Sequence, residues 1–140
     1  MHLEAFVVED NAELRETLVG ALEELTCVRV VGGSATEEEA LQWLAANADW
    51  DLLIVDLFLR GGSGMRLLQQ ARGNRAGQKI VVFSNYVNAA VRKRCAQLGV
   101  DAVFDKSTEL DALVDYCPHL GARQAAPPVV WGGNTRQADV

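Results

Sequence analysis

One apolar run that ends in a carboxylate constrains the fold of this chain more than any other feature. Residues 52–55 (LLIV) are continuously apolar rather than alternating, which predicts a short strand buried on both faces. Asp56 follows this run directly, and a glycine-rich loop extends from it to Gly64. Because ligands of open α/β sheets bind at the carboxyl ends of the strands, Asp56 is placed for chemistry rather than for solubility.

The rest of the chain alternates between strand patterns and helix patterns. We expect strands at residues 3–8, 27–31, 52–55, 79–83 and 100–104, and helices at about 12–25, 37–47, 65–73, 88–98 and 109–117. Asn11, Thr36 and Ser107 or Thr108 are expected to cap helices, and residues 32–34 (GGS) to form a turn. Five strands that alternate with five helices predict a parallel α/β sheet covered on both faces.

Length and charge restrict the class of protein. The 140 residues suffice for one domain, and the net charge of −6 argues against a nucleic-acid surface and favours protein partners. No apolar run is long enough to span a membrane, and the first ten residues lack the basic region of a secretory signal, so we expect a cytoplasmic protein. Cys27, Cys95 and Cys117 lack metal-type spacing and are interpreted as packing residues.

The pattern changes at Pro118. Residues 118–140 are rich in proline, glycine and polar side chains and have no helix or strand period. We therefore expect a domain at residues 1–117 and a flexible tail at 118–140. In an alternative interpretation, residues 129–131 (VVW) dock on a partner or back on the domain.

Polar residues follow four of the five predicted strands. Glu9 and Asp10 follow the first, Asp56 the third, Ser84 the fourth and Lys106 the fifth. A parallel sheet brings these positions to one edge. Clustered carboxylates repel one another unless a cation joins them, and their hard oxygen atoms suit Mg²⁺. Taken singly, Asp10 is better explained as a loop or cap carboxylate, Ser84 as a turn residue and Lys106 as a surface charge, but those explanations do not account for their convergence.

These five residues, in this order and at nearly these intervals, resemble the receiver domain of two-component response regulators. The resemblance covers about residues 3–117, and residues 83–110 are similar to stand-alone members that lack a DNA-binding output domain. It implies a flavodoxin-like (βα)5 sandwich with strand order 2-1-3-4-5. It also implies a signalling protein that catalyses its own phosphoryl transfer and dephosphorylation, rather than an enzyme that turns over a substrate.

The resemblance also implies roles for the residues at the acidic edge. Asp56 would accept a phosphoryl group from a phosphohistidine on a sensor histidine kinase or phosphotransfer protein. Asp10, Asp56 and the backbone carbonyl of Phe58 would ligate Mg²⁺, and Glu9 would hold it through water.

The remaining implied roles concern the phosphoryl oxygens and the output. Lys106, the Ser84 hydroxyl and the Asn85 backbone N–H would bind the phosphoryl oxygens, with Ser84 as the local sensor. The expected contact surface for an unknown downstream protein is the fourth helix, fifth strand and fifth helix (the α4-β5-α5 face of the family), where residues 92–94 (RKR) offer charge.

The chain departs from the family pattern at several positions. The aromatic switch residue normally stands three positions before the lysine, where this chain has Val103, with Phe104 next. Successive strand residues face opposite ways, so Phe104 is a poor substitute and a conventional aromatic switch is not expected. Ser107 and Arg60 replace two common prolines, and the first replacement weakens the case for a cis bond after Lys106.

Two bulky residues stand beside the expected path of hydrolytic water. Phe58 and Tyr86 are each two positions after a site residue, Asp56 and Ser84. We expect slow loss of phosphate because both rings crowd this path. Alternatively, the rings only pack on neighbouring loops.

Three other functions compete with this interpretation. A receiver-like binding module or phosphate sink would keep the fold and signal without the aromatic switch. An aspartyl-phosphate phosphohydrolase typically needs a second acid two residues after the nucleophile, and Phe58 cannot protonate a leaving group. A nucleotide-binding protein is disfavoured because no G-x-G-x-x-G follows the first strand and residues 61–64 (GGSG) lack a phosphate-binding lysine.

Overall fold

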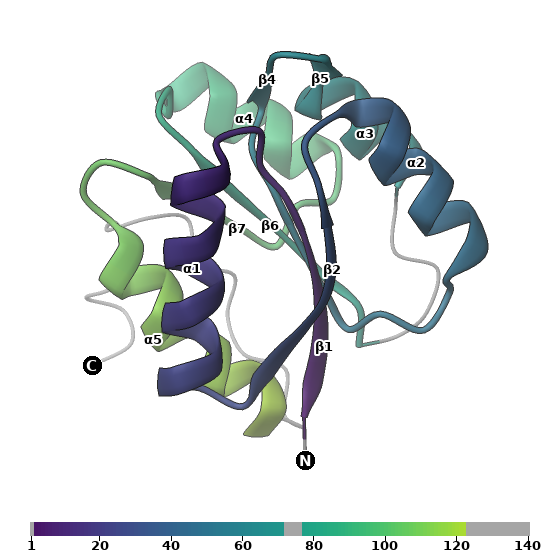
Figure 1. Cartoon of the computed structure of the whole chain (residues 1–140). Helices are drawn as coiled ribbons and strands as arrows, with labels where there is room; N and C mark the ends of the chain where they lie inside the picture. The colour runs from purple at the N-terminus through teal and green to yellow at the C-terminus, as the bar shows by residue number, and fades with distance from the viewer. Residues whose placement is uncertain (1, 72–76, 123–140) are drawn as a thin grey trace.

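Five parallel strands form the central sheet. The computed structural model describes residues 2–71 and 77–122, with side chains up to residue 117. The strands are β1 (Leu3–Val8), β2 (Val28–Ser34), β3 (Leu52–Val55), β6 (Lys79–Ser84) and β7 (Ala102–Asp105). They lie in the order β2-β1-β3-β6-β7, which is 2-1-3-4-5 when these five alone are counted. The predicted flavodoxin-like topology is confirmed (Figure 1).

Helices cover both faces of this sheet. They are α1 (Ala12–Leu25), α2 (Glu37–Ala46), α3 (Gly64–Gln70), α4 (Ala89–Gln97) and α5 (Leu110–Ala122). Helices α1 and α5 contact each other on one face, and α2 and α3 contact each other on the opposite face, which α4 also covers (Figure 1). The side chains of Asn11, Thr36, Ser63 and Asn88 each accept a backbone N–H at the start of a helix. None of the described helices is long and apolar enough to cross a bilayer.

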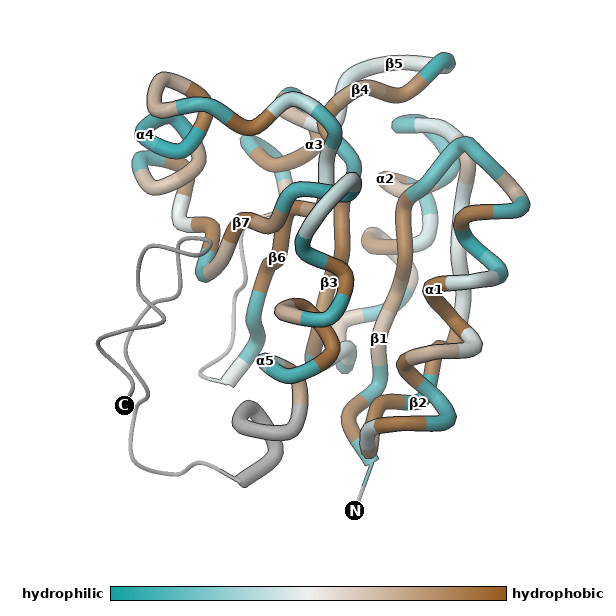
Figure 2. The backbone as a smooth tube through the Cα atoms, turned by 90° about the vertical axis from the view of Figure 1, so that its left-hand side faces the viewer, coloured by the Kyte–Doolittle hydropathy of each residue, from teal (hydrophilic) through white to brown (hydrophobic). Residues whose placement is uncertain are grey.

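The central strands divide their side chains between two cores. In β3, Leu53 and Val55 pack under α2, α3 and α4, whereas Leu52 and Ile54 pack under α1 and α5. All four are at most 1% exposed, which explains the continuous apolar run, and β3 is hydrophobic along its length in Figure 2.

Residues 32–34 form the end of β2 rather than the predicted turn. They pair with the last residues of β1 after a shift of register between Ala5 and Phe6. A Cβ atom on Gly32 would lie 3.1 Å from the Phe6 ring and 3.2 Å from Trp43 Nε1, and these two rings stack at 4.1 Å. Glycine here makes room for an aromatic pair on the sheet, so the prediction of a turn from glycine alone was wrong.

Two details of the helices also differ from the predictions. Ala45, expected in the buried stripe of α2, is exposed, and the half-buried Trp43 packs against the core instead. Helix α3 ends at Gln70, with Ala71 as its cap, before the predicted end near Gly73, which lies outside the described residues.

The last helix begins later and ends later than predicted. The backbone N–H groups of Thr108 and Glu109 both donate to the Asp105 carbonyl, and Ser107 binds the Asp105 carboxylate, so the helix starts at Leu110. It continues to Ala122, so Pro118 lies within the helix rather than at the predicted change of pattern. The boundary between domain and tail stays a prediction, and residues 129–131 lie outside the described part of the chain.

Candidate functional site

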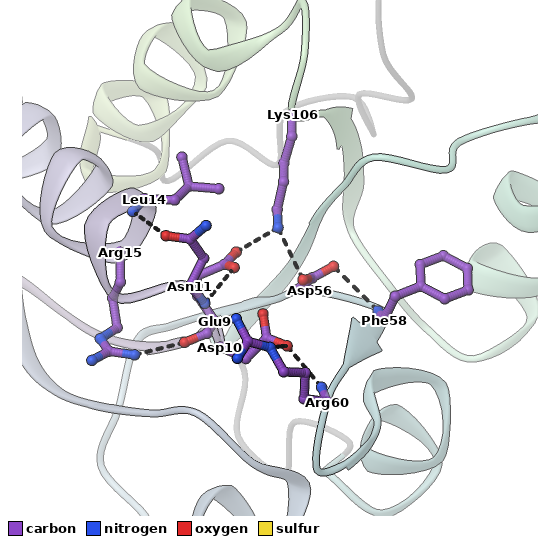
Figure 3. A network of polar contacts seen from close by, with 9 residues as sticks. All are labelled: Glu9, Asp10, Asn11, Leu14, Arg15, Asp56, Phe58, Arg60 and Lys106. Carbon is purple, nitrogen blue, oxygen red and sulfur yellow. Dashed lines mark hydrogen bonds and ion pairs between the residues drawn. The ribbon is translucent and has the colours of Figure 1, made fainter.

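Three carboxylates meet at the carboxyl edge of the sheet. Glu9 and Asp10 follow β1 and Asp56 follows β3, and these strands are neighbours. One ligand oxygen of each residue lies within 4.8 Å of the others. Glu9 and Asp56 are 2% and 4% exposed, and the Asp10 side chain is 15% exposed. The predicted convergence of these residues is confirmed (Figure 3).

Lys106 joins two of these carboxylates. Its Nζ lies 2.7 Å from Glu9 Oε1 and 2.9 Å from Asp56 Oδ2, and its side chain is 7% exposed. Burial works against the charged ammonium, but the hydrogen bonds that it donates to Glu9 and Asp56 and the charges of these carboxylates together outweigh burial, so the pKa of Lys106 is raised. Burial raises the pKa of Glu9 despite its bond to Lys106.

One buried ammonium therefore stands among three carboxylates, and the cluster keeps an excess of negative charge. Clustered carboxylate oxygens are the donors that Mg²⁺ prefers in proteins. The donor set of Glu9, Asp10 and Asp56 thus fits this ion by both its chemistry and its spacing.

Backbone amides of the loop after Asp56 orient two of the carboxylates. The Phe58 N–H donates to Asp56 Oδ1 at 3.2 Å, and the Arg60 N–H donates to Asp10 Oδ2 at 2.7 Å. The Arg60 Nε also lies 3.7 Å from Asp10 Oδ2. A proline in place of Arg60 could not donate the amide bond, so this departure from the family pattern adds a contact to the site. The sequence interpretation missed this role because a main-chain donor leaves no residue-type signature.

Ser84 ends β6 beside β3. Its side chain is fully buried, and its Oγ has no hydrogen-bond partner among the described residues. An unsatisfied buried hydroxyl costs about 1–3 kcal/mol, so its retention at this edge calls for a ligand that completes it. The Ser84 carbonyl accepts the Lys106 N–H at 2.9 Å, which ties the two strand ends together, and Asn85 is the exposed next residue.

Phe58 and Tyr86 form an exposed aromatic pair at the rim. The two residues are 55% and 66% exposed, and their ring centroids lie 5.1 Å apart in an edge-to-face arrangement. In Figure 3 the Phe58 ring points away from the carboxylates. The two rings thus pack on each other, which joins the loops that follow β3 and β6.

The position of the aromatic switch holds a buried valine. Val103 packs in the core under α4, and Phe104 packs in the opposite core, 5.6 Å from the Tyr116 ring. The predicted opposite orientation of these residues is confirmed. All peptide bonds in the described ranges are trans, including the one between Lys106 and Ser107.

Arg92 is not the free surface charge that the predicted contact surface assumed. Its Nη1 donates to the Val103 carbonyl at 3.3 Å, and its Nη2 lies 3.7 Å from Glu109 Oε1. It therefore links α4 to β7 and to the start of α5. Lys93 and Arg94 are exposed.

The comparisons with known proteins agree with this fold. Residues 5–117 match the response regulator receiver domain, and the chain belongs to this family. Among curated proteins it is similar to the response regulator UvrY, with 22% identity to the Escherichia coli K12 protein and 23% to that of E. coli O157:H7. Both matches cover 104 residues, 74% of this chain and 47% of the relative. The chain thus spans about half the length of the curated relatives it matches.

Solved receiver structures share the fold. The non-phosphorylated receiver domain of RcsB from E. coli has a TM-score of 0.78 at 19% identity, covering 94% of this chain and 98% of that one. A LuxR-family response regulator from Aurantimonas sp. SI85-9A1 has a TM-score of 0.76 at 22% identity, covering 91% of each chain.

Proposed function

We propose that this protein is a phosphoacceptor signalling protein. In this proposal Asp56 takes a phosphoryl group from a phosphohistidine on a sensor histidine kinase or phosphotransfer protein, and the modified form acts through protein contacts. The observation that carries it is the buried cluster in which Lys106 bonds both Glu9 and Asp56 beside Asp10. An acceptor, a counter-charge and a set of cation ligands thus share one edge of the sheet.

The transfer needs few changes of bond. A carboxylate oxygen of Asp56 attacks phosphorus, the bond from phosphorus to the imidazole nitrogen breaks, and its electron pair stays on the leaving imidazole. Mg²⁺ held by Asp10, Asp56 and the Phe58 carbonyl, and by Glu9 through water, would supply neutralisation of the phosphoryl charge. Lys106 is placed to hold one phosphoryl oxygen.

The Ser84 hydroxyl is the proposed sensor of phosphorylation. It is fully buried without a hydrogen-bond partner in the described chain, so a phosphoryl oxygen would satisfy it, with the Asn85 N–H beside it. Closure of Ser84 on the phosphate would move the loop whose carbonyl holds the Lys106 N–H. The modification thereby biases loop arrangements that are already accessible, without an aromatic residue at Val103.

A phosphorylation assay tests this function. The protein is incubated with Mg²⁺ and acetyl phosphate, and intact mass is measured for the wild type and for Asp56→Ala. We expect one added phosphoryl group on the wild type and none on the variant. An unmodified wild type, or equal modification of both proteins, would contradict the proposal.

We further propose that the phosphorylated form is long-lived. The rings of Phe58 and Tyr86 pack edge to face two residues after Asp56 and Ser84. In this proposal the pair narrows the path of the hydrolytic water at the rim of the site. The half-life of the phosphoprotein in Mg²⁺ should shorten in Phe58→Asn and in Tyr86→Glu. An unchanged half-life in both variants would mean that the rings serve only packing.

The output surface is proposed to be the α4–β7–α5 face, with Lys93 and Arg94 as its exposed charges. Because the net charge is −6, we expect protein partners rather than nucleic acid or membranes. We also propose that the protein acts in the cytoplasm. A pull-down that compares beryllofluoride-bound protein with Asp56→Ala tests the switch and recovers the partner. Capture that is equal for the two forms would contradict a switch.

A second candidate is a receiver-like binding module or phosphate sink. Buried Val103 favours it, because no aromatic side chain at this position can change its exposure on phosphorylation. Equal partner binding by phosphorylated and unmodified protein would support this candidate.

A further inference from the structure

Glu37, the first residue of α2, is a buried carboxylate that lies outside the acidic cluster. Its residue is 7% exposed, and Arg66 of α3 binds both of its oxygens, with Nε 2.8 Å from Oε2 and Nη2 2.7 Å from Oε1. The Ser63 N–H also donates to Oε1 at 2.9 Å. Ser63 and Arg66 thus both bind this single side chain.

Glu37 and Arg66 fix a short hairpin that follows Asp56. The hairpin consists of β4 (Phe58–Leu59) and β5 (Gly62–Ser63), which pair antiparallel. Its turn is bound to α2 because the Glu37 N–H donates to the Gly61 carbonyl at 3.0 Å. Gly62 has φ +122°, and a Cβ atom there would lie 2.5 Å from Glu37 Cβ, so only glycine allows this approach.

The other side of the same hairpin holds the site. Its Phe58 N–H donates to Asp56 Oδ1, and its Arg60 N–H donates to Asp10 Oδ2. A Cβ atom on Gly64, directly after the hairpin, would collide with the Asp56 carbonyl oxygen, so the loop also packs on the main chain of Asp56. The hairpin therefore transmits its position to both aspartates.

We propose that Glu37 is a positioning residue for the phosphoacceptor site. It touches none of the site carboxylates and acts through the hairpin, whose Phe58 and Arg60 amides orient Asp56 and Asp10. Mutation of partners that orient metal ligands without touching the metal typically lowers metal affinity about tenfold or more. Glu37 orients those partners rather than the ligands themselves, so its loss should leave a less preorganised pair of carboxylates and have a somewhat smaller effect. This inference rests on the proposed role of Asp10 and Asp56.

Calorimetric titration with Mg²⁺ tests the inference. Glu37→Gln is compared with Glu38→Gln, a matched control that removes the same charge from an exposed neighbour in the same turn of α2. We expect Glu37→Gln to raise the Kd for Mg²⁺ by about fivefold to tenfold, and Glu38→Gln by less than about twofold. Phosphorylation of Glu37→Gln by acetyl phosphate should recover at saturating Mg²⁺. Equal Kd values for the two variants would overturn the inference.

A second variant covers a failure of Glu37→Gln to fold. Arg66→Lys keeps the positive charge but lacks the planar guanidinium that forms two parallel bonds to a carboxylate, and it should also raise the Kd for Mg²⁺. In metal-free protein, the Phe58 and Arg60 amides should exchange hydrogen faster in either variant than in Glu38→Gln, and unchanged exchange would also overturn the inference. The wild type could bind Mg²⁺ but take up no phosphoryl group, while Glu37→Gln binds Mg²⁺ more weakly than the wild type. That result would contradict the proposed function and support the positioning role of Glu37.

Discussion

Aspartates lie at both ends of the central sheet. At the amino end their side chains accept hydrogen bonds from backbone amides. Asp51, just before β3, accepts the Glu4 N–H at 2.8 Å, and Asp101, just before β7, accepts the Ile80 N–H at 2.8 Å. Lys79 Nζ lies 4.0 Å from Asp101. Each of these carboxylates binds an amide of the neighbouring strand and stands apart from the other.

At the carboxyl end the acidic side chains are grouped, and their mutual repulsion destabilises the fold locally. Glu9, Asp10 and Asp56 lie within 4.8 Å of one another, Lys106 is their one buried ammonium in the described chain, and Ser84 Oγ is buried without a partner there. Proteins keep such unfavourable clusters at sites of function. The comparison teaches that grouping and incomplete compensation, rather than residue type or position at a strand end, distinguish a functional carboxylate from a structural one.

The largest difference between the two ends should appear in phosphoryl transfer. Asp10→Asn removes a proposed cation ligand and should slow phosphorylation by acetyl phosphate on the order of 100-fold. Asp51→Asn keeps an oxygen acceptor for the Glu4 N–H and should leave the rate within about twofold. The rate is followed by intact mass over time. Similar losses in both variants would remove the functional distinction.

The second-largest difference should appear in stability, between substitutions of Lys106 at the carboxyl end and of Lys79 at the amino end. Lys106→Met leaves Glu9 and Asp56 buried without a counter-charge and should lower the free energy of unfolding by about 3 kcal/mol in metal-free buffer. The Lys79 side chain is 28% exposed, so Lys79→Met should cost less than about 1 kcal/mol. Urea unfolding at pH 7 measures both values. A Lys106→Met variant as stable as Lys79→Met would show that the buried cluster needs no compensation.

The smallest effect concerns the charge of Asp101. Burial raises the pKa of Asp101 above its ordinary 3.8, against the opposing bond from Ile80 and the charge of Lys79. The folded state therefore binds this proton more tightly than the unfolded state, and stability is lost as pH rises through the raised pKa. Asp101→Asn should be about 0.5 kcal/mol more stable than the wild type at pH 7, and equal to it once Asp101 is protonated in both states. Urea unfolding across this range is the measurement, and a difference that grows as pH falls would contradict the assignment.

The convergence of the site could be predicted from sequence because topology determines it. A parallel βα alternation puts every strand end on one edge, so Glu9, Asp10, Asp56, Ser84 and Lys106 needed no knowledge of side-chain contacts. The opposite orientations of Val103 and Phe104 likewise follow from the period of a strand.

The remaining features depend on contacts between distant residues. Residues 32–34 look like a turn, and the stacked rings of Phe6 and Trp43 explain why a glycine stands at position 32 of a strand. Asp10 and Glu37 each accept a backbone N–H, from Arg60 and Ser63 respectively. Any residue except proline can supply such a donor, so these contacts leave no pattern in the sequence. Arg92 reads as a surface charge until its bonds to Val103 and Glu109 are known.

Backbone amide chemical shifts, recorded by NMR on addition of Mg²⁺ and beryllofluoride, test the contrast between the two ends most directly. Beryllofluoride imitates a phosphoryl group on an aspartate, so it reports on the proposed chemistry without turnover. We predict that the amides of Asp10, Asp56, Ser84 and Lys106 shift strongly while those of Asp51 and Asp101 stay unchanged. Shifts of equal size at both ends, or none at Asp56, would contradict the account.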